Sequence, residues 1–201
     1  MLSASDFTAP PRDYQLIVPE GWFQLLLDPD ARDRGIVALA ELQFRGVDNT
    51  PHLKEQFMRE LQRKAKDAYK VGGTELYLST LTIGPVPLAS SLLISVPPAD
   101  EWPRCFNAEE LSEHLASPAD DGQLDVVELS AAGKAVRQRR KEAPDPATQL
   151  GNTLPTTTLT YYVPIPVTKN WLMLTFSTPV DPLADQMVEL FDVVAGTLHW
   201  A

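Results

Sequence analysis

The stretch from Trp171 to Trp200 constrains the fold of this chain more than any other segment. Apolar residues alternate at positions 172, 174 and 176, which predicts a strand with one face in a core. Asp181 and Pro182 then fit the N-cap and the first position of a helix. The large apolar residues that follow are spaced as one helical stripe: Leu183, Met187, Leu190, Phe191, Val194 and Leu198. A strand that leads into such a helix requires a sheet for the strand to join and for the helix to cover.

The rest of the chain supplies the other elements. We expect a flexible arm over residues 1–11 and a single domain over residues 12–201, opening with a hairpin of strands at 14–18 and 22–26. Two helices are expected over 29–47 and 50–70, and a short helix follows Asn107. The remaining strands are expected at 75–83, 88–96, 124–129, 134–142 and 156–167. This order predicts an α+β fold, with an antiparallel sheet of about six or seven strands flanked by helices in an α/β/α sandwich.

Three segments, taken with this order of elements, resemble the PsbP/Mog1-like fold superfamily. They are the opening YQLIVPEGW, the strand WLMLTFSTP and the final helix that runs into Gly-Thr-Leu-His-Trp. Relatives in this superfamily include an extrinsic photosystem subunit, a nuclear Ran-binding factor and mycobacterial lipoproteins. The resemblance implies a non-enzymatic module that binds other proteins, but it carries no functional residue over to this chain. The long tandem helices between Asp30 and Lys70 depart from the superfamily's pattern.

Charge and composition limit the classes of partner. The formal net charge is −10 and the pI is about 4.7, so nucleic acid and anionic membranes are poor partners. The first residues lack the basic and apolar stretches of a signal peptide, and the single cysteine excludes a disulfide framework. We therefore expect a cytoplasmic protein that binds a protein partner, and a second copy of this chain stays open as that partner. A composition rich in Ala, Arg, Asp and Pro resembles that of GC-rich bacteria.

No catalytic, metal or nucleotide motif stands out. The three histidines, at positions 52, 114 and 199, do not have the spacing of zinc ligands. A hydrolase with Ser90 or Ser91 and the distant His114 is the least favoured hypothesis, because no G-x-S-x-G elbow is present. The acidic groups at positions 28/30/33 and 120/121/125 lack the loop of a calcium-binding hand, and Cys105 is expected to be packed rather than reactive. The sequence therefore predicts no catalytic site, no metal and no cofactor.

A basic segment follows the acidic stretch 100–125. It contains Arg137, Arg139, Arg140 and Lys141, and on a strand positions 137, 139 and 141 share one face. One interpretation is that these residues protect an exposed sheet edge from aggregation. The other is that they form a docking strip for an acidic protein partner.

Aromatic residues suggest an alternative function. Trp22, Tyr161, Tyr162 and Trp171 could together line a pocket between the sheet and a helix. Such a pocket would make the protein a carrier of a small molecule or lipid. We favour a non-enzymatic protein-interaction or accessory module over such a carrier.

Overall fold

The computed structural model describes residues 8–46, 51–84, 86–98, 102–103, 105, 107–116, 122–144 and 154–201. Its helices are α1 (Pro29–Gln43), α2 (Pro51–Lys70), α3 (Ala108–Leu115) and α4 (Ala184–Gly196), with a 3-10 turn at Asp181–Leu183. Its strands are β1 (Tyr14–Gln15), β2 (Trp22–Leu26), β3 (Gly73–Ser79), β4 (Thr82–Ile83), β5 (Val86–Pro87), β6 (Ser91–Ser95), β7 (Gln123–Leu129), β8 (Gly133–Glu142), β9 (Thr156–Pro164), β10 (Trp171–Thr178) and β11 (His199–Trp200). Within these residues, no helix is both long and apolar enough to cross a bilayer.

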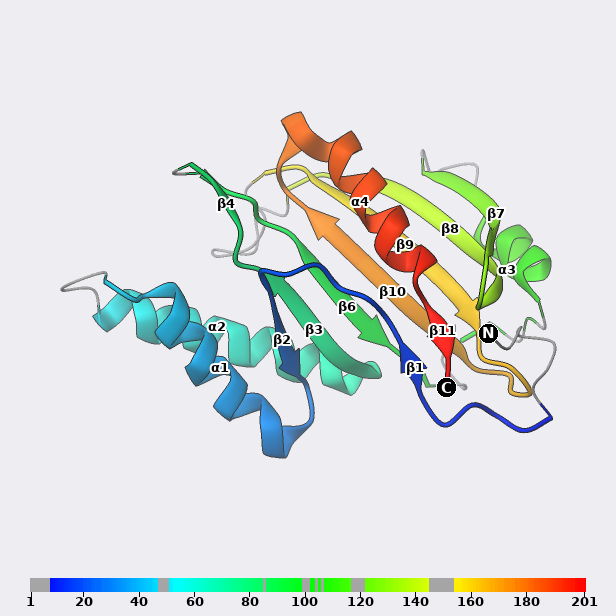
Figure 1. The fold of residues 1–201 in the computed structure, drawn as a ribbon, viewed down its shortest axis with the longest axis horizontal. Coiled ribbons are helices and arrows are strands. Elements are labelled where there is room, and N and C mark those ends of the chain that lie inside the picture. Colours follow the sequence, from blue (N-terminus) through cyan, green and yellow to red (C-terminus); the bar gives the residue numbers. More distant parts are fainter. Residues whose placement is uncertain are drawn as a thin grey trace.

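Seven strands form one sheet in the spatial order β2-β3-β6-β10-β9-β8-β7 (Figure 1). Every neighbouring pair in it is antiparallel. The strand β10 lies at the centre, where Met173 pairs with Ser95 of β6 on one side and with Tyr162 of β9 on the other. The predicted α+β fold, an antiparallel sheet flanked by helices, is confirmed.

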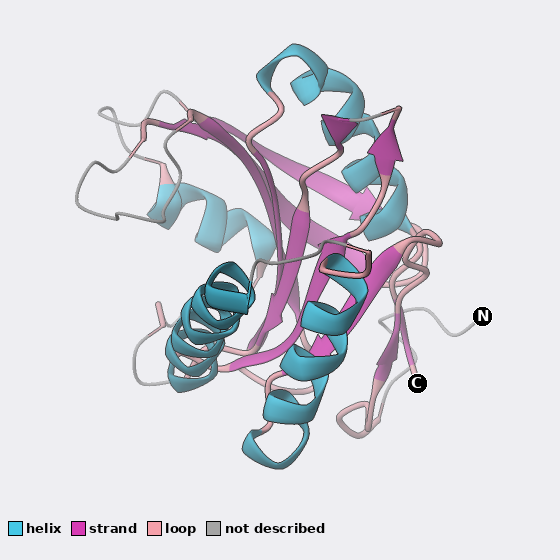
Figure 2. Cartoon of the chain, turned by 90° about the vertical axis from the view of Figure 1, so that its left-hand side faces the viewer, coloured by secondary structure: helices cyan, strands magenta, loops and turns pink. Residues whose placement is uncertain are grey.

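Helices cover both faces of this sheet. In β6, Leu92 and Ile94 pack in the same cluster as Phe191 of α4, whereas Leu93 between them packs in the cluster of α1 and α2. This alternation follows from the period of two in a strand. The helix α3 covers the same face as α1 and α2, over β7, β8 and β9, while α4 lies on the other side together with the small sheet of β1 and β11 (Figures 1 and 2).

The starts of two helices were predicted with different success. At α1, the Asp28 carboxylate accepts a hydrogen bond from the Asp30 backbone N–H at 2.9 Å, as expected for an N-cap before Pro29. At the C-terminal helix, the prediction that Asp181 is the N-cap is wrong. A 3-10 turn occupies 181–183, α4 begins at Ala184, and Leu183 supplies no side-chain cap. Asp181 instead pairs with Lys141 on β8.

The predicted N-terminal hairpin is also wrong. The strand β1 pairs with β11 at the other end of the chain, with Tyr14 opposite Trp200, and β2 pairs with β3 instead. The hydroxyl of Tyr14 donates to Glu75 of β3 at 2.6 Å, which holds this small two-stranded unit against the main sheet. Local alternation had identified the strand at 22–26 correctly, but of the strand expected at 14–18 only residues 14–15 are extended in the sheet. Alternation contains no information about which strand each one pairs with.

Candidate functional site

The basic segment singled out in the sequence lies on β8, and three of its side chains face α4. Each of the three forms an ion pair with an aspartate of the C-terminal helical segment. The pairs are Arg137–Asp192 at 2.8 Å, Arg139–Asp185 at 2.6 Å and Lys141–Asp181 at 2.6 Å. We call these three pairs the β8–α4 ladder.

The ladder changes both interpretations of the basic segment. Edge protection is wrong, because β8 lies between β7 and β9 and is an inner strand. The docking interpretation stays a prediction, but the three cations already have intramolecular partners. Arg140 lies on the opposite face, where the side-chain amide of Gln138 is 2.7 Å from its guanidinium and 2.9 Å from the hydroxyl of Tyr162.

Asp192 is the best-enclosed acceptor of the ladder. It accepts hydrogen bonds from Nε and Nη2 of Arg137 at 2.8 and 2.9 Å, and from the hydroxyl of Tyr161 at 2.5 Å. The hydrogen bond to Asp192 raises the pKa of Arg137. Burial, together with the same carboxylate, raises the pKa of Tyr161. This end of the ladder therefore holds α4 on the sheet with a bidentate, charge-assisted contact.

Exposure increases along the ladder. The exposed fraction of the basic side chain is 13% for Arg137, 32% for Arg139 and 59% for Lys141. The outer two pairs border a hollow of about 430 Å³ between the end of β8 and the start of α4. Its lining is Gln123, Arg139, Arg140, Lys141, Thr157, Asp181, Ala184 and Asp185. The hollow thus contains basic and acidic groups side by side.

Sequence reasoning missed this hollow because its charges come from distant segments. One signal was present: bases at every second position of a strand, and aspartates at positions 181, 185 and 192 on one side of a helix. Two matched rows of opposite charge predict that a strand and a helix pack together. The signal becomes useful only once β8 is known to lie under α4.

The four aromatic residues proposed as one pocket lie on opposite faces of the sheet. Trp22 and Tyr161 pack in the cluster under α4, whereas Tyr162 and Trp171 pack in the cluster under α3. Consecutive residues of a strand point to opposite faces, so Tyr161 and Tyr162 cannot line a common pocket. The single-pocket prediction is therefore wrong for this set. Trp22 meets Phe191 edge-on with ring centroids 6.4 Å apart, and Tyr162 stacks with Trp102 at 5.6 Å.

The histidines and serines considered for a hydrolase lie apart from one another in the structure. His199 lies within 3.0 Å of Gln15, and His52 and His114 are exposed on α2 and α3. The hydroxyl of Ser91 shares a hydrogen bond of 2.7 Å with Ser177, and Ser90 is buried. Both serines belong to the region of β6, whereas α3 packs over β7, β8 and β9. The structure therefore does not bring His114 to either serine.

The remaining candidates are the two acidic groups, at 28/30/33 and 120/121/125, and the thiol of Cys105. Asp28 caps α1 and Asp33 pairs with Arg32 at 3.2 Å, while positions 120 and 121 lie outside the described residues. Among the described residues, no group of three or more His, Cys, Asp or Glu side chains could hold a metal ion. Loss of hydration raises the pKa of Cys105, which opposes formation of a reactive thiolate.

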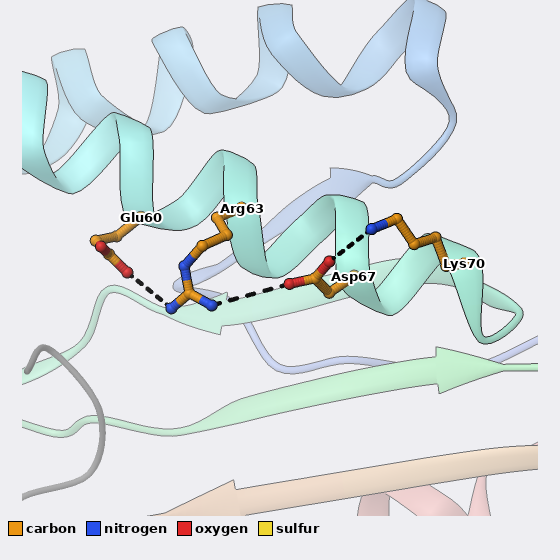
Figure 3. Close-up of polar contacts among 4 residues, drawn as sticks. All are labelled: Glu60, Arg63, Asp67 and Lys70. Carbon is orange, nitrogen blue, oxygen red and sulfur yellow. Dashed lines mark hydrogen bonds and ion pairs between the residues drawn. The ribbon is translucent and has the colours of Figure 1, made fainter. Parts of the chain in front are cut away.

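The helix α2 carries the second notable concentration of charge. It contains six basic residues and three acidic ones, a net charge of +3 in a chain of net charge −10. Arg59, Arg63, Lys66 and Lys70 follow one another at helical spacing and are all exposed. We call this row the α2 ridge. Acidic neighbours flank it: Arg63 lies 3.0 Å from Glu60 and 3.8 Å from Asp67, and Lys70 lies 3.0 Å from Asp67 (Figure 3).

Comparisons of the chain with protein-family models, with curated proteins and with solved structures gave no match. The resemblance to the PsbP/Mog1-like superfamily therefore stays a prediction.

Proposed function

We propose that this protein is a non-enzymatic interaction or accessory module of the bacterial cytoplasm, which binds an acidic segment of a partner protein on the α2 ridge. The observation that carries this proposal is the net charge of +3 on α2, within a chain that is otherwise strongly acidic. The resemblance to a superfamily of protein-binding modules supports the same class of function.

The cations of the α2 ridge are available to a partner. Arg59, Arg63 and Lys70 expose 67%, 55% and 72% of their side chains. Their ion pairs within the helix are surface pairs, which contribute about 0–1 kcal/mol each and exchange readily. The fold does not depend on these side chains, because α2 packs through its other side, where Leu61 and Ala65 are buried.

The dimensions of the ridge favour a protein segment as the partner. From Arg59 to Lys70 the helix rises about 16 Å, the length of about three turns of a facing helix. A long polyanion such as nucleic acid would extend beyond the ridge and meet a surface of net negative charge. A short acidic segment, by contrast, can be neutralised by the ridge alone.

The experiment compares two variants with equal loss of charge. The ridge variant carries Arg63→Gln, Lys66→Gln and Lys70→Gln, and the control carries Arg12→Gln, Arg34→Gln and Arg45→Gln at scattered exposed positions. Glutamine is a good helix former and adds no repulsion to Glu60 or Asp67. Proteins captured from the native host by wild type are identified by mass spectrometry, and their acidic segments are titrated as labelled peptides.

We expect the ridge variant to lose at least tenfold in peptide affinity and the control to bind like wild type. Binding should also weaken as salt rises, because the Debye length falls from about 10 Å at 0.1 M to about 3 Å at 1 M. Equal affinity of the two variants would exclude the α2 ridge as the interface. Binding of a DNA or RNA duplex with higher affinity than any acidic peptide would exclude the protein-partner assignment.

A further inference from the structure

We propose that the hollow between β8 and the start of α4 is a binding site for a small zwitterion, such as a free amino acid. The proposal concerns the opposite face of the sheet from the α2 ridge and does not depend on it. It rests on the charges in the hollow, on the hydroxyl of one buried residue that lines it, and on the dipole at the start of α4.

The buried hydroxyl belongs to Thr157 of β9. Thr157 is 4% exposed and lines the hollow, and its hydroxyl forms no hydrogen bond within the described part of the chain. Its register places it between Lys141 on β8 and Thr178 on β10, and it shares the lining of the hollow with Asp181 of the 3-10 turn. The hydroxyl oxygen borders the hollow and is not sealed from solvent, so a ligand in the hollow can exchange a hydrogen bond with it.

The start of α4 contributes its helix dipole rather than free donors. The 3-10 turn before it already accepts from its first residue, because the backbone N–H of Ala184 donates to the carbonyl of Asp181. Ala184 and Asp185 of this first turn line the hollow. The helix dipole makes this end favourable for a negatively charged group.

The mixture of charges selects a zwitterion. Arg139 uses Nη2 for its bond to Asp185, and a guanidinium has five N–H donors, so its other donors can bind a ligand carboxylate. The ligand's ammonium group can lie beside Asp181 or Asp185, which keeps both carboxylates neutralised. A plain anion would meet these two carboxylates, and a plain cation would meet Arg139 and Lys141. A hollow of about 430 Å³ is within the usual range for small ligands, and its charged lining disfavours a lipid.

The first measurement uses the unmodified protein. The twenty common amino acids are added singly, and backbone amide shifts are followed by NMR while thermal unfolding is recorded. We expect saturable shifts confined to residues 139–141, 157 and 181–185, with a raised Tm. For the strongest binder, the matched acid without the amino group and the matched amine without the carboxylate should each bind at least tenfold more weakly. No saturable shift in the hollow, or equal binding of the acid or the amine, would overturn the proposal.

Three variants locate the site. Thr157→Val keeps the shape of the side chain and removes the hydroxyl, and Arg139→Gln removes the guanidinium. Each should weaken binding at least fivefold. Lys134→Gln on the same strand is the control, because Lys134 pairs with Glu109 of α3 outside the hollow. This control variant should bind the amino acid with the affinity of wild type. The ridge variant described above should also bind the amino acid like wild type, so failure of one proposal is distinguishable from failure of the other. Unchanged affinity in both Thr157→Val and Arg139→Gln would exclude the hollow even if an amino acid binds elsewhere.

Discussion

The guanidinium of Arg137 donates two hydrogen bonds to the carboxylate of Asp192, at 2.8 and 2.9 Å, and so joins β8 to α4 across 55 positions of sequence. Only 13% of the Arg137 side chain is exposed. The cation that the sequence suggested for binding a partner therefore binds the protein's own final helix. Several properties of the fold depend on this contact and on its neighbours.

Removing the charge of Asp192 should destabilise the protein more than removing that of Asp185. Asp192→Asn leaves a largely buried guanidinium and the Tyr161 hydroxyl with a weaker acceptor, which should cost about 1–3 kcal/mol. Asp185→Asn affects a more exposed pair and should cost less than about 1 kcal/mol. Urea unfolding of both variants measures the difference. Equal losses would show that the two ends of the ladder are equivalent.

Reversing all three cations of the ladder to Glu should unfold the protein. Arg137, Arg139 and Lys141 would become acids opposite three aspartates, and close like charges are strongly unfavourable when they are partly buried. Circular dichroism measures the loss of cooperative melting. A triple variant that melts like wild type would mean that the ladder does not form in solution.

Gly72 should tolerate alanine less well than Gly46. Both have positive φ, +89° and +77°, so each substitution pays the strain of a left-handed residue, about 1–2 kcal/mol. A Cβ at Gly72 would lie 2.1 Å from the backbone oxygen of Val96, whereas a Cβ at Gly46 meets no atom within 4 Å. Gly72→Ala should therefore cost well above Gly46→Ala in urea unfolding. Similar costs would indicate that the turn after α2 can shift away from Val96.

Stability should fall at alkaline pH because three tyrosines resist ionisation in the fold. Burial raises the pKa of Tyr14, Tyr77 and Tyr161, and a nearby carboxylate adds to the effect in each case. The unfolded chain releases these protons near pH 10 while the folded chain retains them, so the free energy of unfolding decreases as pH rises above about 10. Urea titrations between pH 8 and 11 measure this slope. Tyr161→Phe should reduce the slope, and an unchanged slope would assign the effect to other groups.

Truncation after Thr178 should abolish cooperative folding. It removes six large buried apolar side chains: Met187, Val188, Phe191, Val194, Leu198 and Trp200. Burial of each contributes about 1.5–3 kcal/mol, and the sum is comparable with the whole stability of a typical domain. Truncation after Leu198 is the control and should melt cooperatively at a lower Tm. A soluble, cooperatively melting protein that ends at Thr178 would show that α4 is peripheral.

Local patterns predicted the elements of this fold well. The alternation of Leu172, Leu174 and Phe176 identified the buried face of β10, and the same alternation separated Tyr161 from Tyr162 on β9. Applied consistently, that alternation would have rejected the four-residue aromatic pocket. The Asn107 cap was also predicted, and its side chain accepts from the Glu110 backbone N–H at 2.8 Å.

Long-range pairing could not be predicted in the same way. Periodicity assigns a residue to a face of a strand, but the pairing of Tyr14 with Trp200 depends on the order of the whole sheet. The same limit applied to the site, because Arg139 and Asp185 are 46 positions apart and meet only once α4 covers β8. The hollow beside them therefore required the tertiary structure.

The central position of β10 has a consequence for the order of folding. The strands β2, β3 and β6 form one meander early in the chain, and β7, β8, β9 and β10 form a second one late in it. The two halves of the sheet join only where β10 pairs with β6, so one edge of the early half stays open until residues near position 178 have been synthesised. Open apolar strand edges promote aggregation, and pairings between strands that are distant in sequence form slowly. The closing of β10 on β6 is therefore expected to be the step at which newly made chains are most vulnerable.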